Sequence, residues 1–279
     1  MRVPGETGVR ALVTALANRY AGAMIAITRD VSPSLASCEL SFVQRSAIDV
    51  DRAIAQHHAY REALEMLGCR VLALPALEDM PDAVFVEDVA IVLDEVAVST
   101  RPGAPSRRGE GASVAEALAP WRPLLRIEAP GTLDGGDVLR VGRTIYVGEA
   151  ARSNADGIAQ LRALLAPYGY DVRAVSTHGC LHLKSAATLV APGTLLVQPA
   201  WVDATVFAGY RCIEVDPGEE HAANALRIGD GVIHPACFPK TRRRLEDAGI
   251  RVVPLDISEL QKAEGAVTCC SLVFSEPNP

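Results

Sequence analysis

The sequence lacks the features of membrane and exported proteins. No stretch of the 279 residues reaches the roughly 18 consecutive apolar residues that a membrane-spanning helix needs. Asn18 and Arg19 interrupt the short apolar run at 11–17 before it forms the core of a signal peptide. The sequence therefore predicts no membrane partner, and residues 1–23 are expected to form an N-terminal extension outside the fold.

Paired cysteines and an excess of basic charge are also missing. The seven Cys residues, at positions 38, 69, 180, 212, 237, 269 and 270, form neither a C-x-x-C pair nor an evenly spaced framework. This pattern is typical of a reducing compartment, so a cytoplasmic location is predicted. The formal charge of −7 argues against a nucleic-acid partner, which needs a basic face, and suits a small cationic substrate.

Four candidate β-hairpins recur along the chain. They read AIVLDEVAVST at 90–100, VLRVGRTIYVG at 138–148, ATLVAPGTLLVQ at 187–198 and ALRIGDGVIHP at 225–235. Each has two apolar arms around a short turn of Asp, Gly or Pro. Self-similarity at a regular spacing indicates a repeat architecture.

Helix-like stretches lie between the hairpins, and each ends near a glycine that leads into an apolar strand. Apolar residues recur at three- and four-residue steps in 51–67, 153–167 and 239–248. The glycines that follow are Gly68, Gly169 and Gly249. A helix C-cap followed by a buried strand explains this pattern. The chain is therefore expected to hold four complete ββαβ units.

The apolar runs at 24–28 and 266–274 are predicted to be lone strands near the two ends of the chain. Paired together, and joined by helix 51–67, they make a fifth unit and close a ring. Closure removes the exposed sheet edges that otherwise favour aggregation. We therefore predict an α/β fold, a pseudo-symmetric five-bladed propeller of ββαβ units built as a single domain over 24–279, with an open α/β sandwich as the alternative.

Polar and nucleophilic residues stand just before the first strand of the predicted units. These residues are Glu87, Asp88, Asp134, Asp137, His182, Asn224 and Cys269. Rotation about one axis would bring them together at one end of the central channel, in a concave site. A thiol, an imidazole and a carboxylate in such a site can act as nucleophile, general acid/base and orienting group.

Each member of this set also has a purely structural interpretation. Cys269 could be a small buried apolar side chain, and Cys269-Cys270 could be a redox or zinc pair, although zinc sites usually space their thiols by two or more residues. His182 lies in an apolar–polar alternation, CLHLKSAA, that suits a half-buried strand residue. Asp134 in TLDGGD could serve a turn.

Acidic residues crowd around an apolar run in the segment PDAVFVED. Asp82, Glu87 and Asp88 would be costly to bury there without a cation opposite them. A guanidinium meets this need because its planar donors pair with carboxylates in a fork. Arg107 and Arg152 suit a substrate carboxylate, with solvated surface arginines as the alternative.

The remaining histidines are predicted to be structural. His57 and His58 fall on a polar helix face. His178, His221 and His234 lie in loops or at strand ends without functional neighbours.

Six motifs in order, PDAVFVED, RPGAPSRRGE, APGTLDGGDVL, LHLKS, AAN and TCCSL, together resemble the dimethylarginine dimethylaminohydrolase family over residues 24–274. The resemblance implies a five-bladed propeller with no required cofactor and no metal. It further implies a small-molecule substrate, with hydrolysis of Nω,Nω-dimethyl-L-arginine, or of the monomethyl form, to citrulline and dimethylamine or methylamine. A homodimer is compatible with it.

The resemblance also assigns site residues by position. It places the nucleophile on Cys269, the general acid/base on His182 and its carboxylate partner on Asp134, which leaves Cys270 as a bystander. The substrate-binding residues that it implies are Leu40, Asp82, Phe85, Glu87, Asp88, Arg107, Arg152 and Ala263. Within this set the acids face the substrate nitrogens, Leu40 and Phe85 form the pocket wall, and the two arginines bind the α-carboxylate.

Alternatives of two kinds stay open. Arginine deiminases and amidinotransferases of the same superfamily use the same set of cysteine, histidine and acid, so the motifs separate their substrates poorly. A propeller that binds arginine-like ligands without catalysis is the alternative from another class.

Overall fold

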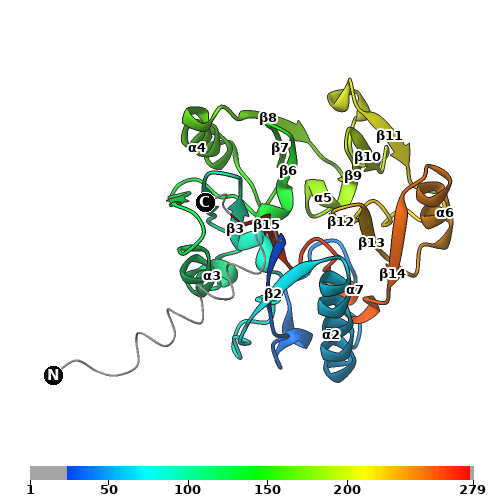
Figure 1. The fold of residues 1–279 in the computed structure, drawn as a ribbon. Helices are drawn as coiled ribbons and strands as arrows, with labels where there is room; N and C mark the ends of the chain where they lie inside the picture. Colours follow the sequence, from blue (N-terminus) through cyan, green and yellow to red (C-terminus); the bar gives the residue numbers. More distant parts are fainter. Residues whose placement is uncertain (1–23, 277–279) are drawn as a thin grey trace.

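Residues 24–276 are described by the computed structural model, and the predicted extension at 1–23 lies outside the described residues, as do residues 277–279. The strands of 24–276 form five three-stranded sheets, which Figure 1 shows arranged around a common centre. The prediction of a five-bladed α/β propeller is therefore confirmed.

Strands from both ends of the described chain close the ring. β15 (Leu272–Ser275) pairs antiparallel with β1 (Met24–Arg29), and β1 pairs in parallel with β2 (Cys69–Leu74). The connection between β1 and β2 carries α2 (Val50–Met66). This blade has the composition predicted for the fifth unit.

Each of the other four blades is an antiparallel hairpin followed by a third strand that runs parallel to the second. In chain order, the next blade contains β3 (Ala90–Val92), β4 (Ala97–Ser99), α3 (Gly111–Leu118) and β5 (Leu124–Arg126). After it come β6 (Val138–Val141), β7 (Thr144–Glu149), α4 (Ala155–Leu165) and β8 (Asp171–Ser176).

The last two blades follow the same order. One contains β9 (Ala187–Ala191), β10 (Thr194–Val197), the short 3-10 helix η6 (Ala204–Phe207) and β11 (Arg211–Glu214). The other contains β12 (Leu226–Ile228), β13 (Gly231–Pro235), α6 (Pro239–Asp247) and β14 (Arg251–Leu255). All four predicted hairpins are present, and in one blade a single 3-10 turn replaces the expected helix.

Side-chain caps and glycines set the ends of the helices. Asp49 caps α2 and Asn154 caps α4, each by accepting a hydrogen bond from the backbone N–H three residues further on, at 3.0 and 2.8 Å. Gly68 and Gly169 follow helical segments with φ of +92° and +74°, a conformation that glycine adopts without a Cβ penalty. The connection to the next strand therefore starts where the sequence predicts.

The predicted strand at 266–274 is shorter than expected. β15 begins only at Leu272, and the residues before it form turns in which the Cys269 N–H donates to the Ala266 carbonyl at 3.2 Å. The apolar run is buried as predicted, but it is buried as a turn. Cys269 consequently lies directly in front of the strand.

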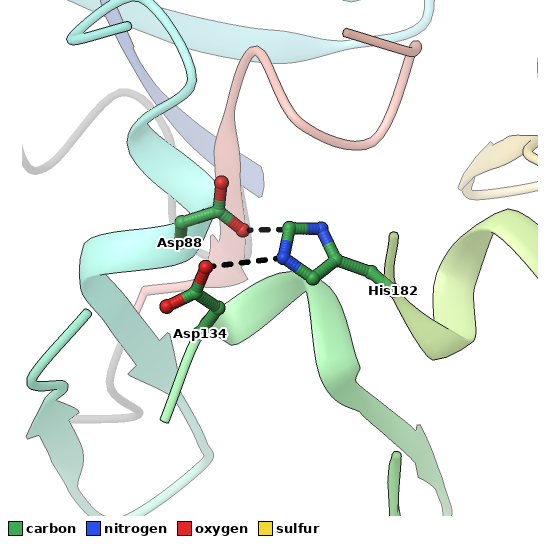
Figure 2. A group of neighbouring side chains, drawn as sticks. All are labelled: Asp88, Asp134 and His182. Carbon is green, nitrogen blue, oxygen red and sulfur yellow. Dashed lines mark hydrogen bonds and ion pairs between the residues drawn. The ribbon is translucent and has the colours of Figure 1, made fainter. Parts of the chain in front are cut away.

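The alternation CLHLKSAA is likewise not a strand. His182 precedes the short helix α5 (Leu183–Ala186), and β9 begins only after that helix. The His182 imidazole, directly before this helical turn, points toward the carboxylates of Asp88 and Asp134 (Figure 2).

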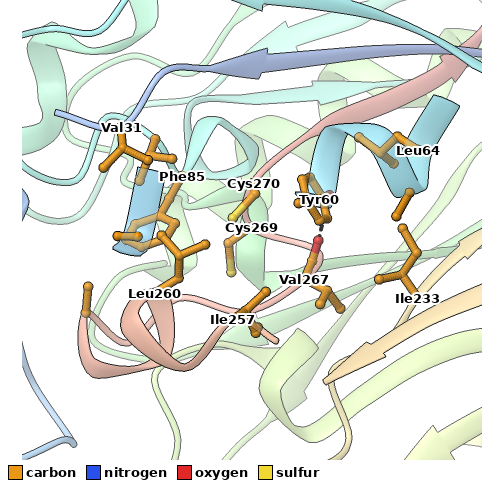
Figure 3. Close-up of a cluster of buried hydrophobic side chains, with 14 of the residues drawn as sticks. Val31, Tyr60, Leu64, Phe85, Ile233, Ile257, Leu260, Val267, Cys269 and Cys270 are labelled. Carbon is orange, nitrogen blue, oxygen red and sulfur yellow. Dashed lines mark hydrogen bonds between the residues drawn. The ribbon is translucent and has the colours of Figure 1, made fainter. Parts of the chain in front are cut away.

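A hydrophobic core under α2 supports the turn that carries the two adjacent cysteines. Figure 3 shows Cys269 and Cys270 between the rings of Phe85 and Tyr60. The Tyr60 hydroxyl donates to the Val267 carbonyl at 2.8 Å. A side chain from a distant helix therefore fixes the backbone just before Cys269.

No helix within 24–276 combines the length and the apolar character that crossing a lipid bilayer requires.

Candidate active site

A small cavity lies where segments from several blades meet. Its lining residues are Glu39, Asp82, Phe85, Asp88, Arg107, Arg152, Leu181, His182, Ala263, Glu264 and Cys269. The cavity holds about 20 Å³, which is roughly the space of one water molecule. The thiol of Cys269 and the imidazole of His182 share this cavity although 87 positions separate them in the sequence.

His182 is held between two buried carboxylates. Its Nε2 lies 3.1 Å from Oδ2 of Asp134, and its Nδ1 lies 3.8 Å from Oδ1 of Asp88 (Figure 2). Burial by itself lowers the pKa of His182, but the carboxylates of Asp88, Asp134 and Asp137 outweigh it and raise this pKa to about 9. The imidazole is therefore protonated at neutral pH in this structure.

The acids around His182 are themselves fixed by hydrogen bonds. Asp134 accepts from the Gly103 N–H at 2.8 Å. Asp137 accepts from the Leu183 N–H at 3.0 Å and from the Ser153 hydroxyl at 2.6 Å, and burial raises its pKa to about 6. Because the Leu183 N–H directly follows His182, Asp137 fixes the backbone that carries the imidazole.

The two glycines of TLDGGD allow backbone and side chains to approach closely. A Cβ at Gly135 would lie 1.9 Å from the Glu87 carbonyl oxygen, and a Cβ at Gly136 would lie 2.5 Å from Nδ1 of His182. The Gly136 N–H also donates to Oδ1 of Asp88 at 2.9 Å. These glycines therefore serve close packing around the imidazole and not merely a turn.

Arg107 is buried and engaged by acids of its own chain. It bonds Asp88 Oδ2 at 2.5 Å and Glu110 Oε2 at 2.9 Å, and it donates to the carbonyls of Asp82 and Phe85 at 3.2 Å. Burial acts to lower the pKa of Arg107, but Asp88 and Glu110 raise it well above its usual value. The guanidinium thus neutralises the acids on one side of the cavity.

The Arg152 guanidinium has more unused N–H donors than that of Arg107. Within residues 24–276 its side chain makes one hydrogen bond, which Nη2 donates to the Ser41 hydroxyl at 3.3 Å. It lies on the cavity wall, 9% exposed. A carboxylate that entered the cavity could therefore pair with Arg152 without displacing an acid of the protein.

Burial, Glu87 and Asp88 raise the pKa of the Cys269 thiol far above its usual value, so the thiol is protonated in this structure. Cys270 is buried too, and it bonds the Ala266 carbonyl at 3.5 Å and does not line the cavity. The two adjacent cysteines thus have different surroundings, and only Cys269 faces the imidazole site.

Eight of the predicted site residues line the cavity: Asp82, Phe85, Asp88, Arg107, Arg152, His182, Ala263 and Cys269. Asp134 stands behind His182, fully buried. Leu40 lies half-buried on an irregular segment and packs against the hydrophobic core around Phe85 and Cys269. The remaining residue, Glu87, does not line this cavity.

The carboxylate of Glu87 pairs with Lys184 and accepts from the Thr268 hydroxyl at 2.9 Å. Both Glu87 and Lys184 line a separate cavity of about 240 Å³, with Leu139 and Leu226 among its walls. The structure therefore does not place Glu87 on the wall that Cys269 shares, although its charge contributes to the raised pKa of that thiol.

Several residues of the site escaped the sequence analysis. Glu39, Leu181 and Glu264 line the cavity, and Glu110 neutralises Arg107 from behind. Lys184 stands in the LHLKS motif, so its charge beside His182 was a usable signal. Glu110 and Glu264 carry no local signal, because their partners come from distant segments.

Asp88, Asp134 and His182 are the metal-ligand candidates among residues 24–276, with ligand atoms within 4.8 Å of one another. Asp88 is already engaged by Arg107 and the Gly136 N–H, and Asp134 by the Gly103 N–H. A cation would have to compete with the Arg107 guanidinium and the protonated imidazole. The group is better suited to holding a proton on His182 than to holding a metal.

Curated relatives share most of the chain. A protein of Streptomyces coelicolor named N(G),N(G)-dimethylarginine dimethylaminohydrolase is 42% identical over 253 residues, which are 90% of this chain and 97% of the relative. A protein of the same name from Pseudomonas aeruginosa is 39% identical over 228 residues, covering 81% and 90%. No family model matches the chain.

Solved structures agree with these relatives. A mutant of the Pseudomonas aeruginosa dimethylarginine dimethylaminohydrolase, solved in complex with citrulline, superposes with a TM-score of 0.86 at 37% identity and covers 89% of this chain and 98% of that one. The N-terminal domain of ArgZ, an arginine dihydrolase from cyanobacteria, has a TM-score of 0.79 at 19% identity, covering 92% and 100%. The second likeness shows the fold alone.

Proposed function

The chain belongs to the dimethylarginine dimethylaminohydrolase family, and from this we propose that it hydrolyses Nω,Nω-dimethyl-L-arginine, and the monomethyl form, to citrulline and dimethylamine or methylamine. The single observation that carries the proposal is the cavity that Cys269 shares with a histidine held protonated by carboxylates. A thiol and an acid catalyst on one small cavity suit the displacement of an amine from a guanidinium carbon.

The carboxylates of Asp82 and Asp88 give the cavity its preference for a cation. Both are buried on its wall, and burial raises the pKa of Asp82. A bound guanidinium would offer these acids planar N–H donors and would keep its own central carbon electrophilic. Phe85, which is 4% exposed, supplies an apolar wall for the aliphatic part of the substrate.

The substrate itself promotes formation of the thiolate. Burial and neighbouring acids hold the proton on Cys269, so the thiol needs an added positive charge before it can attack. A guanidinium bound beside Asp88 is such a charge, and it favours the thiolate over the thiol, whose proton leaves to solvent. Activation is in this sense substrate-assisted.

The reaction then proceeds in two balanced steps. The Cys269 sulfur forms a bond to the guanidinium carbon, and the bond from that carbon to the dimethylamino nitrogen breaks as His182 gives its proton to the departing amine. Water enters, His182 takes one of its protons, and the resulting hydroxide attacks the carbon. The C–S bond breaks, the proton of the new hydroxyl group passes to the leaving sulfur, and citrulline is formed with the Cys269 thiol restored.

The α-carboxylate of the substrate pairs with Arg152. This arginine has free donors on the cavity wall, whereas Arg107 has already used most of its donors on Asp88, Glu110 and two carbonyls. Arg107 contributes one remaining N–H. Ala263 and Leu40 would complete the pocket around the amino-acid end.

The decisive assay measures citrulline from dimethylarginine, monomethylarginine and arginine side by side. We expect citrulline from the methylated substrates, loss of turnover but not of binding for Cys269→Ser, and retained activity for Cys270→Ser. Citrulline from arginine alone would indicate an arginine deiminase, and binding without citrulline would indicate a non-catalytic arginine-binding propeller. Loss of activity in Cys270→Ser only would move the nucleophile by one residue.

Three further expectations belong to this proposal. Residues 24–279 act as one catalytic domain, and residues 1–23 are not needed for turnover. The protein works in the cytoplasm, as the unpaired cysteines suggest, and takes neither nucleic acid nor membrane as partner. A homodimer is compatible with the fold, and sedimentation velocity measures the oligomeric state.

A further inference from the structure

An irregular loop at 38–46 lies beside the cavity and contributes Glu39 to its wall. Most of its residues are exposed, and the segment contains neither helix nor strand. Phe42, at 54% exposure, has little core to pack against. Cys38 and Leu40 pack against the core around Phe85 and Cys269, whereas residues 41–46 have few buried apolar contacts. Such segments open locally at low cost, so polar contacts decide whether this part of the loop stays closed.

One carboxylate binds three consecutive backbone N–H groups of this loop. Glu264 accepts from Ser41 at 2.9 Å, from Val43 at 2.6 Å and from Phe42. Hydrogen bonds to a charged acceptor are roughly twice as strong as neutral ones. Glu264 has φ of +57°, an uncommon backbone conformation for a non-glycine residue that here accompanies a side chain aimed at the loop.

Glu264 also stands between the cavity and the outside. An outer groove of about 350 Å³ is lined by Phe42, Val43, Leu181 and Glu264, together with Trp201 and other residues. Leu181 and Glu264 line the inner cavity as well. The two spaces therefore share a wall made of these two side chains.

The inner cavity is too small for its proposed substrate. Pockets for small-molecule ligands enclose on the order of 300–1,000 Å³, whereas this one holds about 20 Å³. A methylated arginine can reach Cys269 only if the wall or the loop moves. The described conformation is therefore a closed one.

Three other hydrogen bonds tie the loop to distant segments. One is a single exposed bond from the Ser106 hydroxyl to the Glu39 carboxylate at 2.7 Å, and the other two use groups that the substrate needs. Asp82 accepts from the Glu39 N–H at 3.1 Å, and Arg152 donates to the Ser41 hydroxyl at 3.3 Å. Under the proposed function, Asp82 meets the substrate's nitrogens and Arg152 its carboxylate. Glu264 has no such competing duty, so it can hold the loop while substrate is bound.

We propose that the Glu264 carboxylate is the latch of this active site, a positioning residue that holds the 38–46 loop closed over Cys269 and the bound substrate. That Glu264 holds the loop over bound substrate rests on the proposed function, whereas its holding the loop over Cys269 does not. The latch works by hydrogen bonding, and a carboxylate of the same charge but shorter reach should fail to bind all three N–H groups.

Access to the Cys269 thiol tests the latch independently of turnover. Iodoacetamide is added to the full chain, and alkylation of each cysteine is followed by peptide mass spectrometry, with the half-buried Cys212 as internal reference. We expect Glu264→Gln and Glu264→Asp each to alkylate Cys269 roughly tenfold faster than the parent protein, because charge-assisted bonds are lost. Alkylation of Cys212 should not change.

Glu259→Gln is the matched control. Glu259 lies on α7 (Ser258–Lys262), also accepts a backbone N–H, that of Asp49 at 3.0 Å, and makes no contact with residues 41–43. It should leave Cys269 alkylation within about twofold of the parent rate. An equal rise of the alkylation rate in the control, or no rise in either Glu264 variant, would overturn the latch. A rise in Glu264→Gln alone would also overturn it, because that result indicates an effect of the Glu264 charge on the thiol.

Kinetics with substrate then separate the two proposals. If the chain hydrolyses dimethylarginine, Glu264→Asp should raise KM by about tenfold with a smaller change in kcat, because the closed complex is less stable. Bound citrulline should protect Cys269 from iodoacetamide in the parent protein and protect it less in the variant. Faster alkylation without any citrulline production would retain the latch and reject the hydrolase.

Discussion

Two buried histidines in this protein have opposite pKa shifts. His182 is 5% exposed and His57 is 1% exposed, so their burial is similar. Carboxylates raise the pKa of His182 to about 9, whereas burial together with the nearby Arg61 lowers the pKa of His57 to about 3. The difference comes from what each imidazole faces.

His57 lies on α2, stacked on the ring of Tyr60 with centroids 5.9 Å apart, and its Nε2 has no hydrogen-bond partner among residues 24–276. His182 has a carboxylate oxygen 3.1 Å from one ring nitrogen. Burial disfavours the charged imidazole in both places, and only the acids around His182 reverse that penalty. The carboxylates around a buried histidine, and not its degree of burial, therefore distinguish a candidate catalyst from a core residue.

The largest expected difference in activity is between replacing His182 and replacing His57. His182→Gln should lower citrulline production by roughly 10²–10⁴-fold, since a general acid/base contributes about that much. His57→Gln should change kcat/KM by less than about threefold, because His57 does not line the cavity. Steady-state citrulline assays on both variants make the measurement, and equal losses would mean that the geometry around His182 has no catalytic meaning.

Removing one carboxylate should lower the pKa of His182 toward that of His57. In the parent protein, kcat/KM should fall as pH rises through about 9, because kcat/KM reports ionisation in the free enzyme, where the raised pKa keeps the catalytic proton on His182 below that pH and loses it above. Asp134→Asn should lower kcat by roughly 10²-fold and shift this alkaline limb to lower pH by one unit or more.

The control for Asp134→Asn is Asp171→Asn, which removes an exposed carboxylate whose one ion pair among residues 24–276 is with Arg173. Its pH profile should match that of the parent protein. An alkaline limb that stays near pH 9 in Asp134→Asn would contradict the assignment of the raised pKa to this carboxylate.

A single added methyl group at Gly136 should disturb the imidazole without changing any charge. The new Cβ would lie 2.5 Å from Nδ1 of His182 and 2.8 Å from Oδ1 of Asp88, so His182 must move. We expect Gly136→Ala to lower kcat by roughly tenfold to a hundredfold, with a smaller change in KM. Gly142→Ala is the comparison in an open turn, where stability can fall because φ is +62° but the site is untouched.

The smallest effect concerns stability at acid pH. The folded state binds no proton at His57 until about pH 3, whereas the unfolded chain binds one near 6.5, so stability falls as pH drops below 6.5. At pH 5 this term is about 2 kcal/mol. His57→Gln should therefore show a flatter dependence of the unfolding free energy between pH 7 and 5 in urea titrations.

His221→Gln serves as the reference for this slope because the His221 side chain is 57% exposed. It should leave the acid slope as it is. If His57→Gln kept the full parent slope, the lowered pKa of His57 would be wrong.

The sequence predicted the blades better than the turns between them. Hairpins such as 138–148 alternate apolar and polar residues around a local turn, so their signal is contained in eleven residues. The run at 266–274 is apolar throughout, and it is a turn up to Leu272 because Tyr60, from distant α2, binds the Val267 carbonyl. No local pattern carries that information.

The prediction that His57 falls on a polar helix face was wrong for a similar reason. α2 contacts β2, α7 and β14, so its buried face is wider than its own apolar pattern indicates. The sequence did bring His182, Asp134 and Cys269 together, through the repeated position before the first strand of a blade. It missed Glu110 and Glu264, because their roles depend on Arg107 and on the 38–46 loop.

The account depends most on the carboxylates that hold the proton on His182. NMR titration of the protein with isotope-labelled histidine, assigned through His182→Gln and His57→Gln, measures both pKa values in one experiment. We expect the His182 imidazole to titrate near pH 9 and His57 to stay neutral down to about pH 3. A His182 signal that titrates at or below pH 6.5 would contradict the account.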